Sequence, residues 1–235
     1  MGKRIKILYW ELISGKREDL DSSGFDLDDA NKYIRQTLAP VEGIFKEMED
    51  YAKQHNIPII KPEVGKLLAV LGNILKPSRI LEIGTAIGYS AILMSKFVKP
   101  GGVIDTIDRN GVMIKTARLN IKRAGMDKII NVIEGDALEV LTCLEKRYHM
   151  IFIDASKGQY AEFLPECLRM LETGGLLVSD NVLYRGIVID SSIVRRRDKT
   201  IAYRLKEYLE KLCRNKELET TILPVADGVS LSVKR

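Results

Sequence analysis

From residue 79 onward, short apolar runs alternate with stretches in which apolar residues recur at helical spacing. The runs have the length of buried strands, and they fall at residues 79–83, 103–108, 129–134, 150–154 and 176–180. A helical stretch follows each of the first four. The pattern therefore predicts an α/β fold, Rossmann-like, with a mostly parallel, doubly wound sheet and right-handed crossovers.

The C-terminal end follows a different pattern. A helical stretch at residues 200–213 precedes two more strand-like runs, at 220–225 and 229–233. The tight Asp227-Gly228 turn between these runs is typical of an antiparallel hairpin. The hairpin would complete a seven-stranded sheet.

The chain before the sheet is predicted to be helical. Helices are expected at residues 26–38, 41–55 and 62–75, the last opened by Pro62. We expect residues 1–24 to be a poorly ordered, charged extension and residues 25–235 to form a single domain. Within that domain, residues 25–76 would be the N-terminal helices and residues 77–235 the α/β core.

Composition changes this picture little. With 235 residues, 46% of them hydrophobic, the chain can bury one sizeable core, and its net charge of +5 favours an anionic partner only weakly. No apolar run approaches the roughly 18 residues of a membrane span, and the N-terminus makes a poor signal peptide. The three cysteines are scattered without metal-ligand spacing, which fits a reducing cytoplasm.

Two of the apolar runs end in acidic residues. The run at 150–153 leads into Asp154, with Lys157 three residues further on, and the run at 176–179 leads into Asp180 and Asn181. The carboxyl ends of parallel strands meet at one edge of the sheet, where ligands bind. Three hard oxygen ligands at that edge predict a site for Mg²⁺ or another divalent cation, with positions left for water or substrate.

The earlier strands end in residues suited to a nucleotide-like cofactor. Gly84 and Gly88 bracket the turn after the first strand, where glycine lets backbone approach a ligand closely. Their G-x-x-x-G spacing differs from the G-x-G-x-x-G of dinucleotide binders, which disfavours NAD. Asp108, at the end of the second strand, is placed to bind ribose hydroxyls, and Asp136 with Ala137 follows the third.

Each of these motifs also has a simpler interpretation. A glycine pair is more often a turn than a cofactor loop, an aspartate after a strand is often a helix cap, and Lys157 alone would be a solvated lysine. Four such motifs on four successive strand ends are harder to explain as caps.

Together these residues resemble the metal-dependent class I O-methyltransferases, the group that includes catechol and caffeoyl-CoA O-methyltransferases. The resemblance runs from about residue 26 to the C-terminus and is carried by residues 82–90, Asp108, residues 135–137, residues 154–157 and residues 180–181. Within the family, residues 57–59, 154–160, 179–186 and 223–228 are most similar to the bacterial tRNA 5-hydroxyuridine methyltransferases.

The resemblance implies a role for each motif. S-adenosylmethionine would be bound by Ile60, Glu82, Gly84, Tyr89, Ser90, Asp108, Asp136, Ala137 and Asp154. Asp154, Asp180 and Asn181 would hold Mg²⁺ or another divalent cation, and Lys157 would be the general base. The cation lowers the pKa of the acceptor hydroxyl. Lys157 can take the proton if the cation and partial burial depress its own pKa.

The family resemblance leaves the acceptor open. Small residues, Ala155 and Ser156, follow Asp154, and a basic run lies at residues 195–199. Both favour an RNA acceptor, the wobble 5-hydroxyuridine of tRNA, which would be methylated to 5-methoxyuridine. The alternatives are a small catechol or caffeoyl-CoA-type acceptor, and a binding module without chemistry. In the family, helices such as those at residues 26–75 pair two subunits, so a homodimer is expected.

Overall fold

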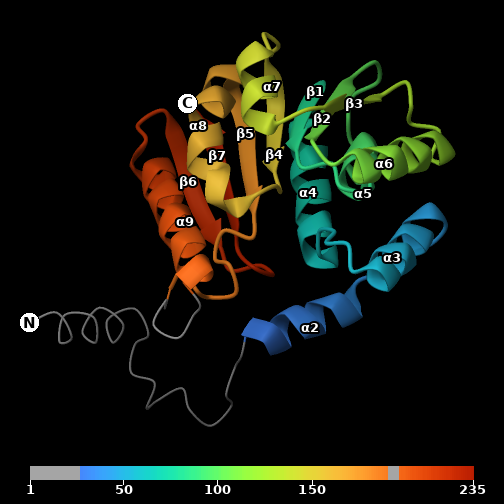
Figure 1. Ribbon diagram of the computed structural model, residues 1–235, viewed down its shortest axis with the longest axis horizontal. Helices are drawn as coiled ribbons and strands as arrows, with labels where there is room; N and C mark the ends of the chain where they lie inside the picture. The colour runs from blue at the N-terminus through green and yellow to red at the C-terminus, as the bar shows by residue number, and fades with distance from the viewer. Residues whose placement is uncertain (1–26, 190–195) are drawn as a thin grey trace, which may run out of the picture. The chain divides into compact units, whose positions relative to one another are not determined.

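The computed structural model describes residues 27–189 and 196–235 (Figure 1). The helices are α2 (Leu27–Thr37), α3 (Ile44–His55), α4 (Pro62–Leu75), α5 (Tyr89–Ser95), α6 (Gly111–Arg123), α7 (Ala137–Cys143), the 3₁₀ turn η1 (Lys157–Gln159), α8 (Tyr160–Met170) and α9 (Arg196–Arg214). The strands are β1 (Arg79–Ile83), β2 (Val103–Asp108), β3 (Ile130–Glu134), β4 (Tyr148–Ile153), β5 (Leu171–Asp180), β6 (Leu218–Leu223) and β7 (Val229–Lys234).

Residues 38–235 form one compact unit, and α2 falls in a separate first unit. Helix α2 belongs to the first unit, whereas the sequence placed it with the domain that follows. The predicted extension at residues 1–24 lies outside the described residues. None of the helices described is long and apolar enough to cross a membrane.

The second unit is built on a seven-stranded sheet, which confirms the predicted fold class. The strand order is β3-β2-β1-β4-β5-β7-β6, with β1 to β5 parallel and β7 antiparallel to both of its neighbours. The order reverses between β1 and β4. In open α/β sheets, the crevice at such a reversal is where ligands bind.

One strand is longer than predicted. β5 begins at Leu171, and its pairing with β4 shifts register between Tyr148 and Met150. Gly174 and Gly175 lie in this stretch, and a glycine pair reads as a turn in sequence. Between the pairs Tyr148–Leu171 and Met150–Leu176, β5 bulges out of the ladder, and Gly174 has a positive φ of 76° there.

Helices cover both faces of the sheet (Figure 1). Alternation along β1 and β4 sends Ile80 and Phe152 to the face packed by α3, α4, α5 and α6. The same alternation sends Leu81 and Ile153 to the face packed by α7, α8 and α9. Because apolar side chains on both faces are buried, the sheet is rigid and the carboxyl ends of its strands form a fixed platform.

Candidate active site

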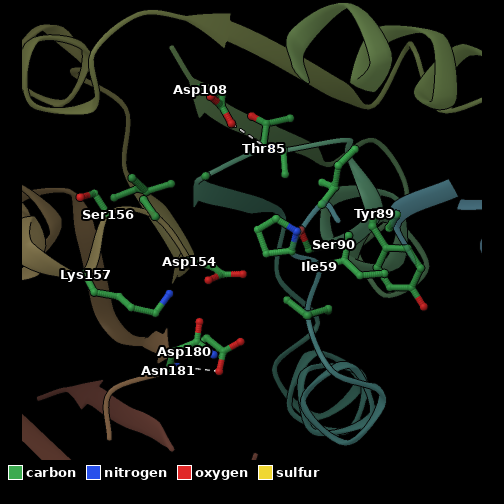
Figure 2. A pocket seen from close by; sticks show the side chains of 18 of the residues that line it. Ile59, Thr85, Tyr89, Ser90, Asp108, Asp154, Ser156, Lys157, Asp180 and Asn181 are labelled. Atoms are coloured by element: carbon green, nitrogen blue, oxygen red, sulfur yellow. Dashed lines mark hydrogen bonds between the residues drawn. The ribbon is translucent and has the colours of Figure 1, made fainter. Parts of the chain in front are cut away.

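A pocket of about 1020 Å³ opens at the carboxyl ends of β1, β2, β4 and β5 (Figure 2). The pocket brings together almost every predicted site residue. Its lining includes Ile60, Gly84, Tyr89, Ser90, Asp108, Asp136, Ala137, Asp154, Lys157, Asp180 and Asn181. Glu82, on β1, is fully buried.

The loop after β1 lies directly against the end of β4. Gly84 has a φ of +110°, and a Cβ built on it would lie 2.2 Å from the carbonyl oxygen of Asp154. The Gly84 amide donates to the carbonyl of Ile107 on β2 (2.9 Å). Only glycine satisfies both the backbone angle and the close approach. The loop is therefore fixed between β2 and β4, beside the acidic residues.

Asp108 is held in place by backbone amides. Its Oδ2 accepts from the Ala86 amide and its Oδ1 from the Asn110 amide, each at 2.9 Å. These bonds join the end of β2 to the loop after β1 and orient the carboxylate at the pocket wall. Each carboxylate oxygen keeps a lone pair for further donors, which suits a pair of ribose hydroxyls.

Glu82 is a neutral acid beneath the pocket. The Thr106 hydroxyl donates to Glu82 Oε2 (2.5 Å) and also lies 2.7 Å from the Thr85 hydroxyl. Complete burial raises the pKa of Glu82 to about 8, although hydrogen bonds from Ser90 and Thr106 oppose the shift. Glu82 therefore carries a proton at neutral pH and can donate a hydrogen bond.

Two predicted cofactor residues already have protein partners. The Tyr89 hydroxyl donates to Glu49 Oε1 (2.7 Å) and points away from the acids in Figure 2. Asp136 caps α7 by accepting from the Leu138 amide (3.0 Å) and pairs with Arg109 (3.1 Å). A cofactor contact by either side chain stays a prediction, since these bonds alone explain where both side chains lie.

Asp154, Asp180 and Asn181 converge at the ends of β4 and β5, and the Lys157 ammonium points toward them (Figure 2). Asp180 is only 1% exposed. Its burial and the nearby Asp154 charge raise the pKa of Asp180 to about 8, against the lowering effects of the Asn181 amide and Lys157. Burial also raises the pKa of Asp154, which Lys157 partly offsets. A cation between the two carboxylates would relieve this repulsion.

The donor set suits a hard divalent cation. Two carboxylates and the Asn181 amide supply oxygen ligands, and Asn181 adopts a left-handed φ of 57° while its backbone amide donates to Asp180 Oδ1 (2.7 Å). Within the described ranges, no group of three or more histidine, cysteine, aspartate or glutamate side chains is arranged to hold a metal. A cation bound here would keep positions for water or for acceptor oxygens.

Sequence reasoning missed the contribution of the β6–β7 turn. Asp227 lines the pocket, and its charge adds to the negative field at Asp180. The carbonyls of Asp227 and Gly228 accept from the Leu183 amide (2.9 Å) and the Val182 amide (3.0 Å). The sequence identified Asp227 only as a turn residue. Placing that turn at the pocket requires the strand order, which the sequence does not contain.

The basic run at residues 195–199 is described only in part. Arg195 lies outside the described residues, and of the run at 195–199 only Asp198 and Lys199 have described side chains. Asp198 accepts a hydrogen bond from the Tyr184 hydroxyl (3.0 Å). Beside the main pocket, a groove of about 540 Å³ is lined by Ser156, Lys157 and Arg204 among others.

Comparisons with known proteins agree with this geometry. The family profile described as O-methyltransferase matches residues 37–235. A catechol O-methyltransferase from Niastella koreensis is 30% identical over 183 residues, covering 74% of this chain and 81% of that protein. A caffeoyl-CoA O-methyltransferase from Medicago sativa is 28% identical over 231 residues, covering 93% of this chain and 94% of that protein.

Solved structures show the same fold. A putative caffeoyl-CoA O-methyltransferase from Staphylococcus aureus is 32% identical with a TM-score of 0.81, covering 89% of this chain and all of that one. An O-methyltransferase from Bacillus cereus, solved in complex with SAH, is 26% identical with a TM-score of 0.78, covering 88% of this chain and 97% of that one. The methyl-donor cofactor predicted from the sequence is therefore supported.

Glu82 gives a pH-dependent stability. Folding raises the pKa of Glu82 from 4.5 to about 8. The protonated side chain therefore makes its full contribution to the free energy of unfolding below pH 4.5. That contribution is lost as pH rises to about 8, by up to about 1.4 kcal/mol per pH unit. Glu82→Gln keeps a neutral side chain of the same shape, so we expect its free energy of unfolding to exceed the wild type's increasingly from pH 5.5 to 8.5. Urea unfolding of the cofactor-free protein measures this. The exposed Glu139→Gln is the control, and parallel pH curves for Glu82→Gln and wild type would contradict the assignment.

The Gly84 contact predicts a specific sensitivity of cofactor binding. Gly84→Ala forces the loop away from the Asp154 backbone, so we expect S-adenosylhomocysteine to bind at least about tenfold more weakly by calorimetry, a loss of about 1.4 kcal/mol. Gly101→Ala is the matched control, because Gly101 also has a positive φ (+77°) but nothing lies within 4 Å of its added Cβ. It should cost about 1–2 kcal/mol of stability and leave binding intact. Equal affinity in the two variants would show that the close approach is unimportant.

Proposed function

The chain belongs to the O-methyltransferase family and is an S-adenosylmethionine-dependent enzyme, and from that premise we propose its acceptor and its metal. The acceptor is a catechol-type small molecule, an aromatic ring with two neighbouring oxygen atoms, one of which receives the methyl group. A divalent cation such as Mg²⁺ is bound by Asp154, Asp180 and Asn181. This acceptor class is the one that the names of the catechol and caffeoyl-CoA relatives favour.

One observation carries the proposal. Two carboxylates and an amide meet at the ends of adjacent strands, and the loop that suits the methyl donor touches the backbone of one of them, Asp154. Two neighbouring oxygens on the acceptor match the open positions left by three protein ligands. Asp154 would therefore adjoin both the donor loop and the cation that holds the acceptor oxygen, and such positioning turns an encounter into a reactive geometry.

The residues of the pocket do the remaining work. When bound, the cofactor supplies an activated methyl group and the cation lowers the pKa of a nearby hydroxyl. Lys157, whose side chain faces the acids, would accept the hydroxyl proton in its neutral amine form. The oxygen then forms its bond to the methyl carbon as the carbon–sulfur bond breaks and sulfur keeps the electron pair. The products are a methyl ether and S-adenosylhomocysteine.

A second candidate acceptor is the wobble 5-hydroxyuridine of tRNA. Its 5-hydroxyl and O4 carbonyl offer the same pair of oxygens. What supports it is the mouth of the pocket, where Ala155 and Ser156 are small and the adjoining groove carries Lys157 and Arg204. The relatives described above are named for catechol and caffeoyl-CoA, so the small-molecule acceptor is the first choice.

An acceptor panel tests both candidates. With S-adenosylmethionine and Mg²⁺, we expect methylation of 3,4-dihydroxybenzoate or caffeoyl-CoA, and none of the 3-methoxy analogue, which lacks the free pair of hydroxyls. Asp180→Asn and Lys157→Met should each lower kcat/KM at least about a hundredfold. Mass spectrometry of the products measures this. Modification of 5-hydroxyuridine tRNA alone would favour the second candidate, and full turnover by Asp180→Asn would contradict the metal site.

The expected homodimer stays a prediction. Helix α4 exposes two large apolar side chains one turn apart, Val70 at 58% and Ile74 at 77%, and a second copy pairing through α4 would cover them. Light scattering after size exclusion should give twice the chain mass at micromolar concentration, and Ile74→Glu should shift it to the monomer. A wild-type monomer would contradict the prediction.

A further inference from the structure

Tyr160 is a buried side chain that the proposed chemistry does not use. It opens α8, directly after the 3₁₀ turn that carries Lys157, and none of its surface is exposed. Its ring meets that of Tyr208 on α9 edge-on, with 5.5 Å between the centroids and an angle of 78° between the ring planes. A tyrosine hydroxyl placed this deep needs polar partners.

Its partners are the backbone groups around the two acids. The Tyr160 hydroxyl lies 3.1 Å from the carbonyl oxygen of Asp180 and 3.5 Å from that of Ile153. The backbone of Ala155 also hydrogen-bonds to it. One hydroxyl thus touches both chain neighbours of Asp154 and the main chain of Asp180.

The position of these contacts matters because the β4–β5 ladder ends there. The last residue pair in register is Ile153 with Ser179. Beyond it, Asp154 donates its amide to Ile83 on β1 (2.9 Å), and Asp180 pairs with Val229 on β7. Asp154 is thus bonded to β1, and Asp180 is paired with β7. Between β4 and β5, at the position where their next backbone pair would be, the Tyr160 hydroxyl joins the two strands.

We infer that Tyr160 is a positioning residue whose hydroxyl fixes the separation of Asp154 and Asp180, and thereby the affinity of the site for a divalent cation. The inference rests on the proposed use of these acids as metal ligands. The Tyr160 hydroxyl limits how far the two strand ends, and with them the two acids, can move relative to each other. Groups outside the ligand shell that orient metal ligands commonly change metal affinity by about 10–100-fold.

The test compares two variants that each lose one buried hydroxyl. Tyr160→Phe keeps the ring and removes the bridge. Tyr208→Phe is the matched control, because Tyr208 is equally buried in the same ring pair but its hydroxyl bonds to the Ser179 side chain (2.6 Å). Mn²⁺ is the probe: calorimetry gives its affinity, and its electron paramagnetic resonance spectrum reports ligand geometry without turnover.

For the full-length protein, we expect Mn²⁺ to bind about tenfold more weakly to Tyr160→Phe with an altered spectrum, and to bind to Tyr208→Phe within twofold of wild type. S-adenosylhomocysteine affinity should be unchanged in both, and saturating Mn²⁺ should restore most of the turnover of Tyr160→Phe. Unaltered Mn²⁺ affinity and spectrum in Tyr160→Phe would overturn the inference, as would equal weakening in both variants. Failure of the wild type to bind Mn²⁺ would instead overturn the proposed metal site.

Discussion

The contact between the Gly84 backbone and the Asp154 carbonyl is the constraint on which the site depends. β1 and β4 pair in register up to Ile83 and Ile153, so the next residues of both strands emerge side by side. A side chain at position 84 would lie 2.2 Å from that carbonyl oxygen, so glycine alone lets the loop after β1 stay against the acid. The part of the pocket that suits a methyl donor and the part proposed to hold a cation share this wall, and the sheet fixes the distance between them.

The electrostatics of the pocket follow from gathering acids at one sheet edge. Asp108, Asp154, Asp180 and Asp227 all line it, and a buried carboxylate is costly unless it is paired or neutralised. Asp108 is compensated by two backbone amides. Asp180 has Lys157 and one amide, and its pKa still rises to about 8. A pocket lined by these acids favours ligands that carry positive charge, such as a sulfonium donor or a divalent cation.

Much of this arrangement was predictable from local sequence patterns, and the exceptions have a common cause. Apolar runs that end in an acid locate Asp108, Asp154 and Asp180 because strand length and strand end are local properties. Three features depend on tertiary neighbours and cannot be predicted from a short stretch of sequence. These are the Tyr89–Glu49 hydrogen bond, the placement of Asp227 at the pocket and the extension of β5 beyond Gly174. The acceptor was hardest to predict, because the same protein residues would serve any molecule that presents two neighbouring oxygen atoms. The sequence favoured tRNA, whereas the relatives are named for catechol and caffeoyl-CoA.

The position of β7 has a consequence for biosynthesis. The last strand of the chain, Val229–Lys234, lies between β5 and β6, and its pairing with β5 extends to Asp180. The turn before it supplies Asp227 and accepts the amides of the loop that follows Asp180. A nascent chain that has emerged from the ribosome only as far as β6 lacks one side of the acidic pocket. The acidic edge is therefore completed only once β7 has emerged, whereas the parallel strands β1 to β4, which carry the loop after β1, can pair earlier in synthesis.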